Sequence, residues 1–78
     1  MTRSYYAGFD VGSSAVHYAV IDGSGAVAYS ARPFMHFADP ISAIRRAWAD
    51  VVGRFPRDTI QATAFTGSGA EFFPEVMP

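Results

Sequence analysis

Hydrophobic residues alternate with small or polar residues through the first part of the chain. Tyr5 to Val11, Ala15 to Asp22 and Ala26 to Arg32 are rich in aromatic and β-branched residues, a composition typical of β-strands. The first two runs are separated by the tight turn Gly12-Ser13-Ser14. The last two are separated by Asp22-Gly23-Ser24-Gly25, which tolerates the positive φ angles of a hairpin. We therefore predict three strands, with the third antiparallel to the second.

A change to helical spacing follows the loop that we expect over Pro33 to Ala38. The apolar stripe consists of Ile41, Ile44, Trp48, Val51 and Val52. Asp39 is suited to cap this helix, with Pro40 at its first position, where the missing N–H costs nothing. We expect Gly53 to end the helix, because glycine is common just beyond a helix end.

A fourth strand is predicted over Thr59 to Thr66, followed by a turn at Gly67-Ser68-Gly69. Ala70 to Phe73 is then expected to begin a short helix. The order β-β-β-α-β predicts an α/β fold with a mixed four-stranded sheet and one main helix on one face. Since the helix makes a crossover, the fourth strand should run parallel to the strand it joins.

Composition narrows the class of protein. The 78 residues are 50% hydrophobic and contain no cysteine, which excludes a disulfide scaffold or an iron–sulfur site made by these residues. The net charge is −1 with no charged cluster, so we expect neither nucleic acid nor a membrane surface as partner. No apolar run suggests an export signal or a membrane span, and we expect a cytoplasmic protein. A short chain with this many apolar residues favours one partial domain, and we expect Pro78 to lie at an artificial boundary. A homodimer is also possible.

The segment Asp10-Val11-Gly12-Ser13-Ser14 carries the most chemical information. Gly12 lets the backbone approach a phosphate closely, and turn amides can form an anion-binding nest. The hydroxyls of Ser13 and Ser14 add donors, and Asp10 is placed to hold Mg²⁺ through its waters. The plain alternative is an ordinary turn, in which the carboxylate of Asp10 accepts hydrogen bonds from amides.

The run from Gly8 to Ser14 resembles the first phosphate motif of the BadF/BadG/BcrA/BcrD ATPase family, within the actin and sugar-kinase superfamily. Val20 to Gly25 is similar to the end of that family's second strand and its Gly turn, and Thr66-Gly67-Ser68-Gly69 resembles its second glycine motif. The resemblance covers nearly all of this chain but only the first part of a family domain. His17 stands where the family has Lys, and Ala70 where it has Arg; both departures argue against efficient hydrolysis.

The resemblance implies the N-terminal half of a ribonuclease H-like, actin-like ATPase fold. It also implies ATP or ADP with Mg²⁺, held by Asp10, by Gly12 to Ser14, by His17 and by Gly67, Ser68 and Gly69. Activators of this family use ATP hydrolysis to send an electron from a [4Fe–4S] cluster to a dehydratase or reductase of acyl-CoA substrates. We expect this chain to hold the phosphates, to need the rest of its parent domain and to be inactive alone.

Two other functions fit the same residues. A sugar, acetate or pantothenate kinase of the superfamily would use the same phosphate loop. A stand-alone interaction module would use Gly12-Ser13-Ser14 only as a turn. Apart from its family position, His17 is best explained as a core histidine, and His36 as part of an apolar cluster that packs over the sheet. Two histidines without cysteine are a weak metal site.

Overall fold

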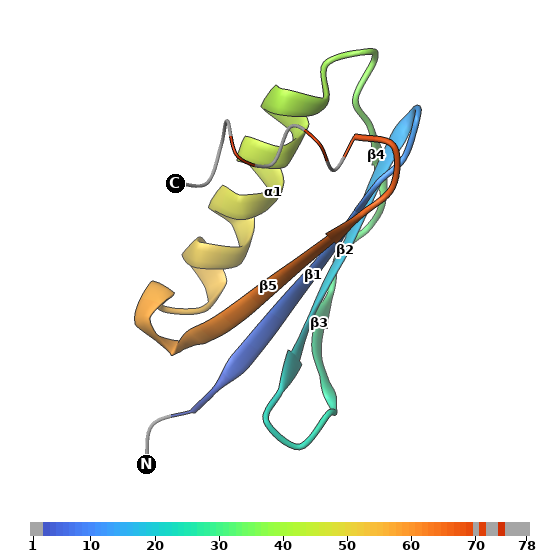
Figure 1. Ribbon diagram of the computed structural model, residues 1–78. Coiled ribbons are helices and arrows are strands. Elements are labelled where there is room, and N and C mark those ends of the chain that lie inside the picture. The colour runs from blue at the N-terminus through green and yellow to red at the C-terminus, as the bar shows by residue number, and fades with distance from the viewer. Residues whose placement is uncertain (1–2, 70, 72–73, 75–78) are drawn as a thin grey trace.

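A computed structural model describes residues 3–69, 71 and 74 of the chain. One helix packs on one side of a sheet in an α/β arrangement (Figure 1). The elements are β1 (Tyr5–Val11), β2 (Ala15–Asp22), β3 (Val27–Ser30), β4 (Phe34–Met35), α1 (Pro40–Arg54), the 3₁₀ turn η1 (Arg57–Thr59) and β5 (Ile60–Thr66). The predicted helix over Ala70 to Phe73 lies outside the described residues.

The sheet is mixed and follows the order β3-β2-β1-β5, with β4 paired to β2. β1 and β5 run parallel, as the crossover through α1 predicts, while β2 is antiparallel to β1, β3 and β4. The predicted count of four strands is wrong, because the sheet has five strands within the described residues. Phe34 and Met35 pair with Val16 and Ala15, and a two-residue strand is too short to produce an alternating pattern.

Helix α1 begins as the sequence predicts. Asp39 is its N-cap, its Oδ1 accepting a hydrogen bond from the Ser42 N–H at 3.2 Å, and Pro40 is the first helical residue. The prediction that Gly53 ends the helix is wrong, since the helix continues to Arg54. The stop comes from Phe55, which is extended and donates its N–H to the Val51 carbonyl at 2.8 Å. Pro56 then prevents further helix.

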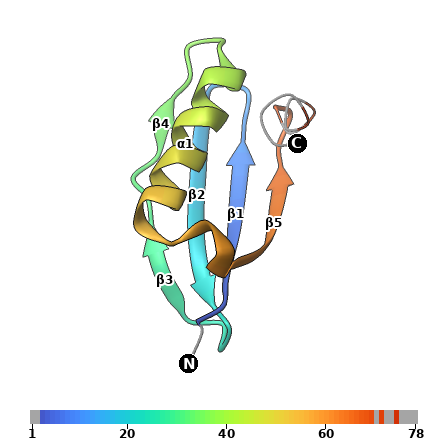
Figure 2. The same cartoon turned by 90° about the vertical axis from the view of Figure 1, so that its left-hand side faces the viewer.

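Figures 1 and 2 show that α1 lies over one side of the sheet, and the core lies between the helix and this side. Alternate residues of β1 point toward the helix and are buried, while those between them are exposed. Phe9 is at the centre, stacked on Phe65 and close to Trp48. The core cluster consists of Tyr5, Ala7, Phe9, Val11, Val16, Tyr18, Val20, Ala43, Ile44, Ala47 and Val51.

No described residue forms a layer on the other side of the sheet. Tyr6 and Ile21 point to this side and are 40% and 38% exposed. His17 also points there and is exposed. Its interpretation as a core histidine is therefore wrong, because its neighbours Val16 and Tyr18 are the residues that face α1. Within the part of the chain that the structure describes, no helix is long and apolar enough to cross a membrane.

Candidate functional site

The turn between β1 and β2 has free backbone donors. It is closed by the Gly12 N–H, which donates to the Ala15 carbonyl at 2.9 Å. Ser13 and Ser14 are exposed at its tip, and their N–H groups donate to no other described residue. Adjacent free amides at a tight turn are the arrangement that binds anions. The turn therefore has the donors that a phosphate needs.

The glycine-rich loop after β5 packs directly against this turn. The Gly69 N–H donates to the Val11 carbonyl at 2.8 Å. Gly67 has φ +94°, and a Cβ there would overlap the same carbonyl and lie 2.8 Å from Oδ1 of Asp10. A Cβ on Gly69 would overlap Cγ1 of Val11. Two motifs far apart in the sequence thus meet at the end of β1, and only glycine fits at either contact.

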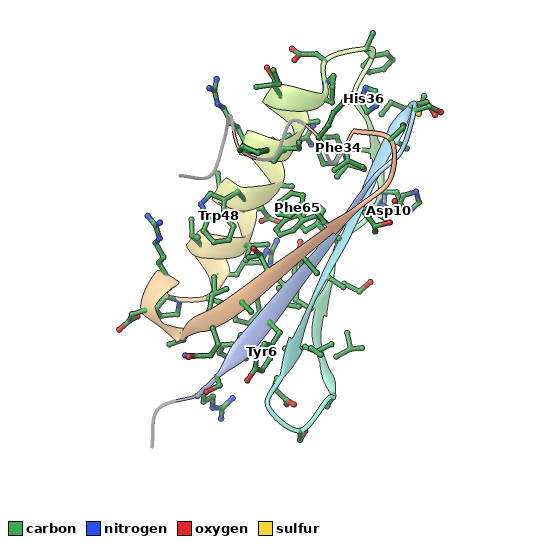
Figure 3. All side chains as sticks on the ribbon, viewed as in Figure 1. Tyr6, Asp10, Phe34, His36, Trp48 and Phe65 are labelled. Atoms are coloured by element: carbon green, nitrogen blue, oxygen red, sulfur yellow. The ribbon has the colours of Figure 1, made fainter. Side chains whose placement is uncertain are left out.

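Asp10 is the second-last residue of β1 and points to the side of the sheet away from α1. Figure 3 shows its side chain on the opposite side of the strands from Trp48 and Phe65. Its register partners on the neighbouring strands are His17 and Thr66, and such cross-strand neighbours have Cβ atoms about 5 Å apart. The carboxylate of Asp10 makes no hydrogen bond to another described residue. A histidine, a carboxylate and a hydroxyl therefore form one exposed row.

Most of the candidate residues line one of two separate hollows. One, of about 450 Å³, is lined by the row of Asp10, His17 and Thr66 and includes the small residues Gly8, Ala19 and Ala64. The other, of about 370 Å³, is lined by Gly12, Ser13, Ser68 and Gly69 together with His36, Ala38 and Pro40. Gly67 lies against Asp10, where the two motifs meet. Ser14 lines neither hollow and stays exposed at the turn.

Two residues of the site were missed from the sequence. Thr66 was placed at the end of a strand and at the start of the second glycine motif but was given no role at the site, although a strand end beside Asp10 is a signal for a polar partner. His36 was expected to pack over the sheet in a cluster with its apolar neighbours; His36 is 8% exposed, but that cluster does not form, because Met35 and Phe37 are 50% and 84% exposed. His36 also donates from Nε2 to the Gly12 carbonyl at 2.9 Å. No sequence pattern indicates that hydrogen bond, because it depends on how the loop before α1 folds.

The donors present suit magnesium better than a transition metal. No group of three His, Cys, Asp or Glu side chains that could hold a metal ion occurs among the described residues. Asp10 offers one exposed carboxylate beside the turn, and Mg²⁺ typically uses one or two carboxylates, waters and substrate phosphates. Asp10 therefore fits a magnesium ion that arrives with a phosphate. The chain has no cysteine, so it supplies no thiolate to an iron–sulfur cluster.

Comparison of the chain with known proteins identifies no family. No protein-family model, no curated protein and no solved structure matches the chain.

Proposed function

We propose that this chain is the phosphate-binding part of an ATP-binding domain of the actin and sugar-kinase superfamily, similar to the BadF/BadG/BcrA/BcrD ATPases. The observation that carries the proposal is the contact between the two glycine motifs. The loop of Gly67 to Gly69 packs on Val11, immediately before the free amides of Ser13 and Ser14. An ordinary turn needs no second glycine loop against it.

The strand arrangement also supports the proposal. The three antiparallel strands β1, β2 and β3 are followed by the two-residue strand β4, by α1 and by β5, which adds to β1 in parallel. Apart from β4, this is the order of elements expected for the ribonuclease H-like half of such ATPases. Here the turn after β1 and the end of β5 lie at one edge of the sheet, where the loop of Gly67 to Gly69 contacts Val11.

Each residue then has a role that its position allows. The amides and hydroxyls of Ser13 and Ser14 hold phosphate oxygens, and Gly12 permits their close approach. Asp10 orients Mg²⁺ through coordinated water, and the ion offsets the charge of the phosphates. His17, exposed beside Asp10, donates to a phosphate oxygen from the position where the resembling family has Lys.

The finer proposal concerns the whole protein. The pair of motifs favours an activator that uses ATP to drive electron transfer to a dehydratase or reductase of acyl-CoA substrates. A [4Fe–4S] cluster would need cysteines that this chain does not contain. Within these residues the function is phosphate binding, and we expect hydrolysis to need the remainder of the domain.

Calorimetric titration with Mg-ADP and Mg-ATP tests the proposal on the longest natural form of the protein. We expect binding, and a loss of at least about tenfold in affinity in Asp10→Ala, equivalent to about 1.4 kcal/mol. Asp58→Ala is the matched control, because Asp58 is exposed on η1 and should leave binding unchanged. A folded protein that binds neither nucleotide would refute the proposal and leave an interaction module.

A further inference from the structure

His36 holds both sides of the candidate phosphate turn. Its Nε2 donates to the Gly12 carbonyl at 2.9 Å, and its backbone N–H donates to the Ser14 carbonyl at 2.9 Å. Figure 3 shows the side chain between the tip of the β1–β2 hairpin and the loop before α1. One residue from another part of the chain therefore fixes the two carbonyls that flank Ser13.

The bond to the Gly12 carbonyl sets the direction of the Ser13 amide, and the bond to the Ser14 carbonyl fixes the peptide that leads into β2. In a planar trans peptide the C=O and the following N–H point in opposite directions. When His36 holds the Gly12 carbonyl toward itself, the Ser13 N–H in the same peptide must point away from His36. Without that bond, the peptide could rotate and direct the Gly12 carbonyl, a repulsive group, toward an anion.

Packing alone does not explain a histidine at this position. The side chain is 8% exposed, and its Nδ1 is buried without a hydrogen-bond partner among the described residues. A buried unsatisfied nitrogen is unfavourable, and a phenylalanine would fill the space without it. The bond from Nε2 to the turn is the interaction that a phenylalanine could not make.

The loop that carries His36 is itself held in an unfavourable conformation. Phe37 and Ala38 follow with φ of 50° and 62°, in the left-handed region that non-glycine residues avoid. Such strain persists where surrounding contacts fix the backbone, and it is common at functional sites. Here the fixed points are the bonds of His36 to the turn and the Asp39 N–H, which donates to the His36 carbonyl at 2.9 Å.

We propose that His36 is a positioning residue, which orients the Ser13 amide for a phosphate without contacting it. This inference rests on the proposed phosphate-binding function. It assigns a role to a residue outside both glycine motifs.

Two substitutions at His36 separate its hydrogen bond from its bulk. His36→Phe keeps the ring and removes the donor, whereas His36→Gln keeps a donor near the position of Nε2. Mg-ADP affinity would be measured by calorimetry, and amide hydrogen exchange of Ser13 and Ser14 by NMR without nucleotide. We expect His36→Phe to lose about tenfold in affinity and to change exchange at Ser13 more than at Ser14, and His36→Gln to restore most of both properties.

The outcomes distinguish this role from the function on which it rests. If His36→Phe binds Mg-ADP as the wild type does, the positioning role is overturned and phosphate binding stands. If the wild type does not bind, the proposed function fails, and hydrogen exchange alone decides whether His36 orients the turn. If His36→Phe does not fold, His36→Gln decides alone. We expect His36→Gln to keep most of the wild-type affinity and exchange. A loss of about tenfold in affinity in His36→Gln, together with altered exchange at Ser13, would overturn the role.

Discussion

Asp50 is the residue that connects α1 most directly to the sheet. Its Oδ2 accepts hydrogen bonds from the hydroxyls of Tyr18 at 2.6 Å and Tyr29 at 2.8 Å, and its Oδ1 accepts one from Nε of Arg54 at 2.9 Å. The bond from Tyr18, followed by those from Tyr29 and Arg54, lowers the pKa of Asp50, whereas desolvation opposes the shift. Burial and the same carboxylate raise the pKa of Tyr18. These bonds connect β2 and β3 to the last turns of the helix.

We predict that Asp50→Ala lowers the free energy of unfolding by about 2 kcal/mol, because two part-buried hydroxyls lose a charged acceptor. Since folding lowers the pKa of Asp50, its contribution is complete above the unfolded value of about 3.9 and decreases as pH falls through the folded pKa. Urea unfolding at pH 7 and below pH 3 measures both effects. Asp58→Ala is the control, and a difference between wild type and Asp50→Ala that grows in acid would contradict the account.

Gly67 and Gly53 should respond to alanine in opposite ways. Gly67→Ala places a methyl group on the Val11 carbonyl at a positive φ, so we expect a loss of at least about 1 kcal/mol in unfolding free energy. Gly53 lies within α1 with open space around it, and Gly53→Ala should stabilise by about 0.5–1 kcal/mol. Denaturant midpoints of the two variants test this pair. Equal effects would mean that the loop after β5 does not pack on β1.

At the scale of elements, local signals in the sequence predicted most of the fold. β1 and β2 have the predicted bounds, and β5 begins one residue later than expected, at Ile60. Those strands have long alternating runs, whereas β4 does not, since two residues cannot establish a period. The prediction that Gly53 ends the helix was wrong because glycine need not adopt a positive φ. Among the described glycines, only Gly25 and Gly67 do so.

The site was predictable only in part for the same reason. The glycine motifs are local in sequence, so Gly12, Ser13, Ser14, Gly67, Ser68 and Gly69 could be named from it. Their contact depends on β5 pairing beside β1, which the crossover implied. The bond between His36 and Gly12 depends on an irregular loop, and no period in the sequence encodes such a loop.

The loop between β4 and α1 should gain stability from a single glycine. Ala38 has φ 62°, and a left-handed conformation costs a non-glycine residue about 1–2 kcal/mol. We expect Ala38→Gly to raise the unfolding free energy by about 0.5–1 kcal/mol after the greater entropy of the unfolded glycine is included. Ala49→Gly, at an exposed position in α1, should instead destabilise by about 1 kcal/mol. Thermal unfolding of both variants gives the sign of each change in stability. Destabilisation by both substitutions would show that Ala38 is not strained in the native loop.

At the scale of the whole molecule, the core is one-sided. α1 covers one side of the sheet, and the side that carries Asp10 and His17 has no second layer among the described residues (Figures 1 and 3). The candidate phosphate site therefore lies at an edge where the covered and uncovered sides meet. This arrangement leaves the exposed row of Asp10, His17 and Thr66 accessible to a ligand.

Substitutions at two isoleucines test whether the core lies on only one side of the sheet. Ile44 on α1 is 0% exposed, whereas Ile21 on the uncovered side is 38% exposed. Ile44→Ala should cost about 2–5 kcal/mol because it leaves a cavity in the core. Ile21→Ala should cost no more than about 1 kcal/mol, because its side chain is already partly in water. Urea unfolding of the two variants gives the comparison, and equal costs would show that the uncovered side is packed in solution.

An NMR titration of the ¹⁵N-labelled protein with Mg-ADP tests whether the two glycine motifs form a phosphate site. We expect the largest amide shifts at Gly12, Ser13, Ser14, Ser68 and Gly69, with smaller ones at Asp10. The hairpin turn of Gly23 and Gly25, at the other end of β2, should not respond. Saturating shifts confined to the two glycine motifs would support a phosphate site made by both. No shift in the folded protein, or shifts only at the distant hairpin turn, would contradict it.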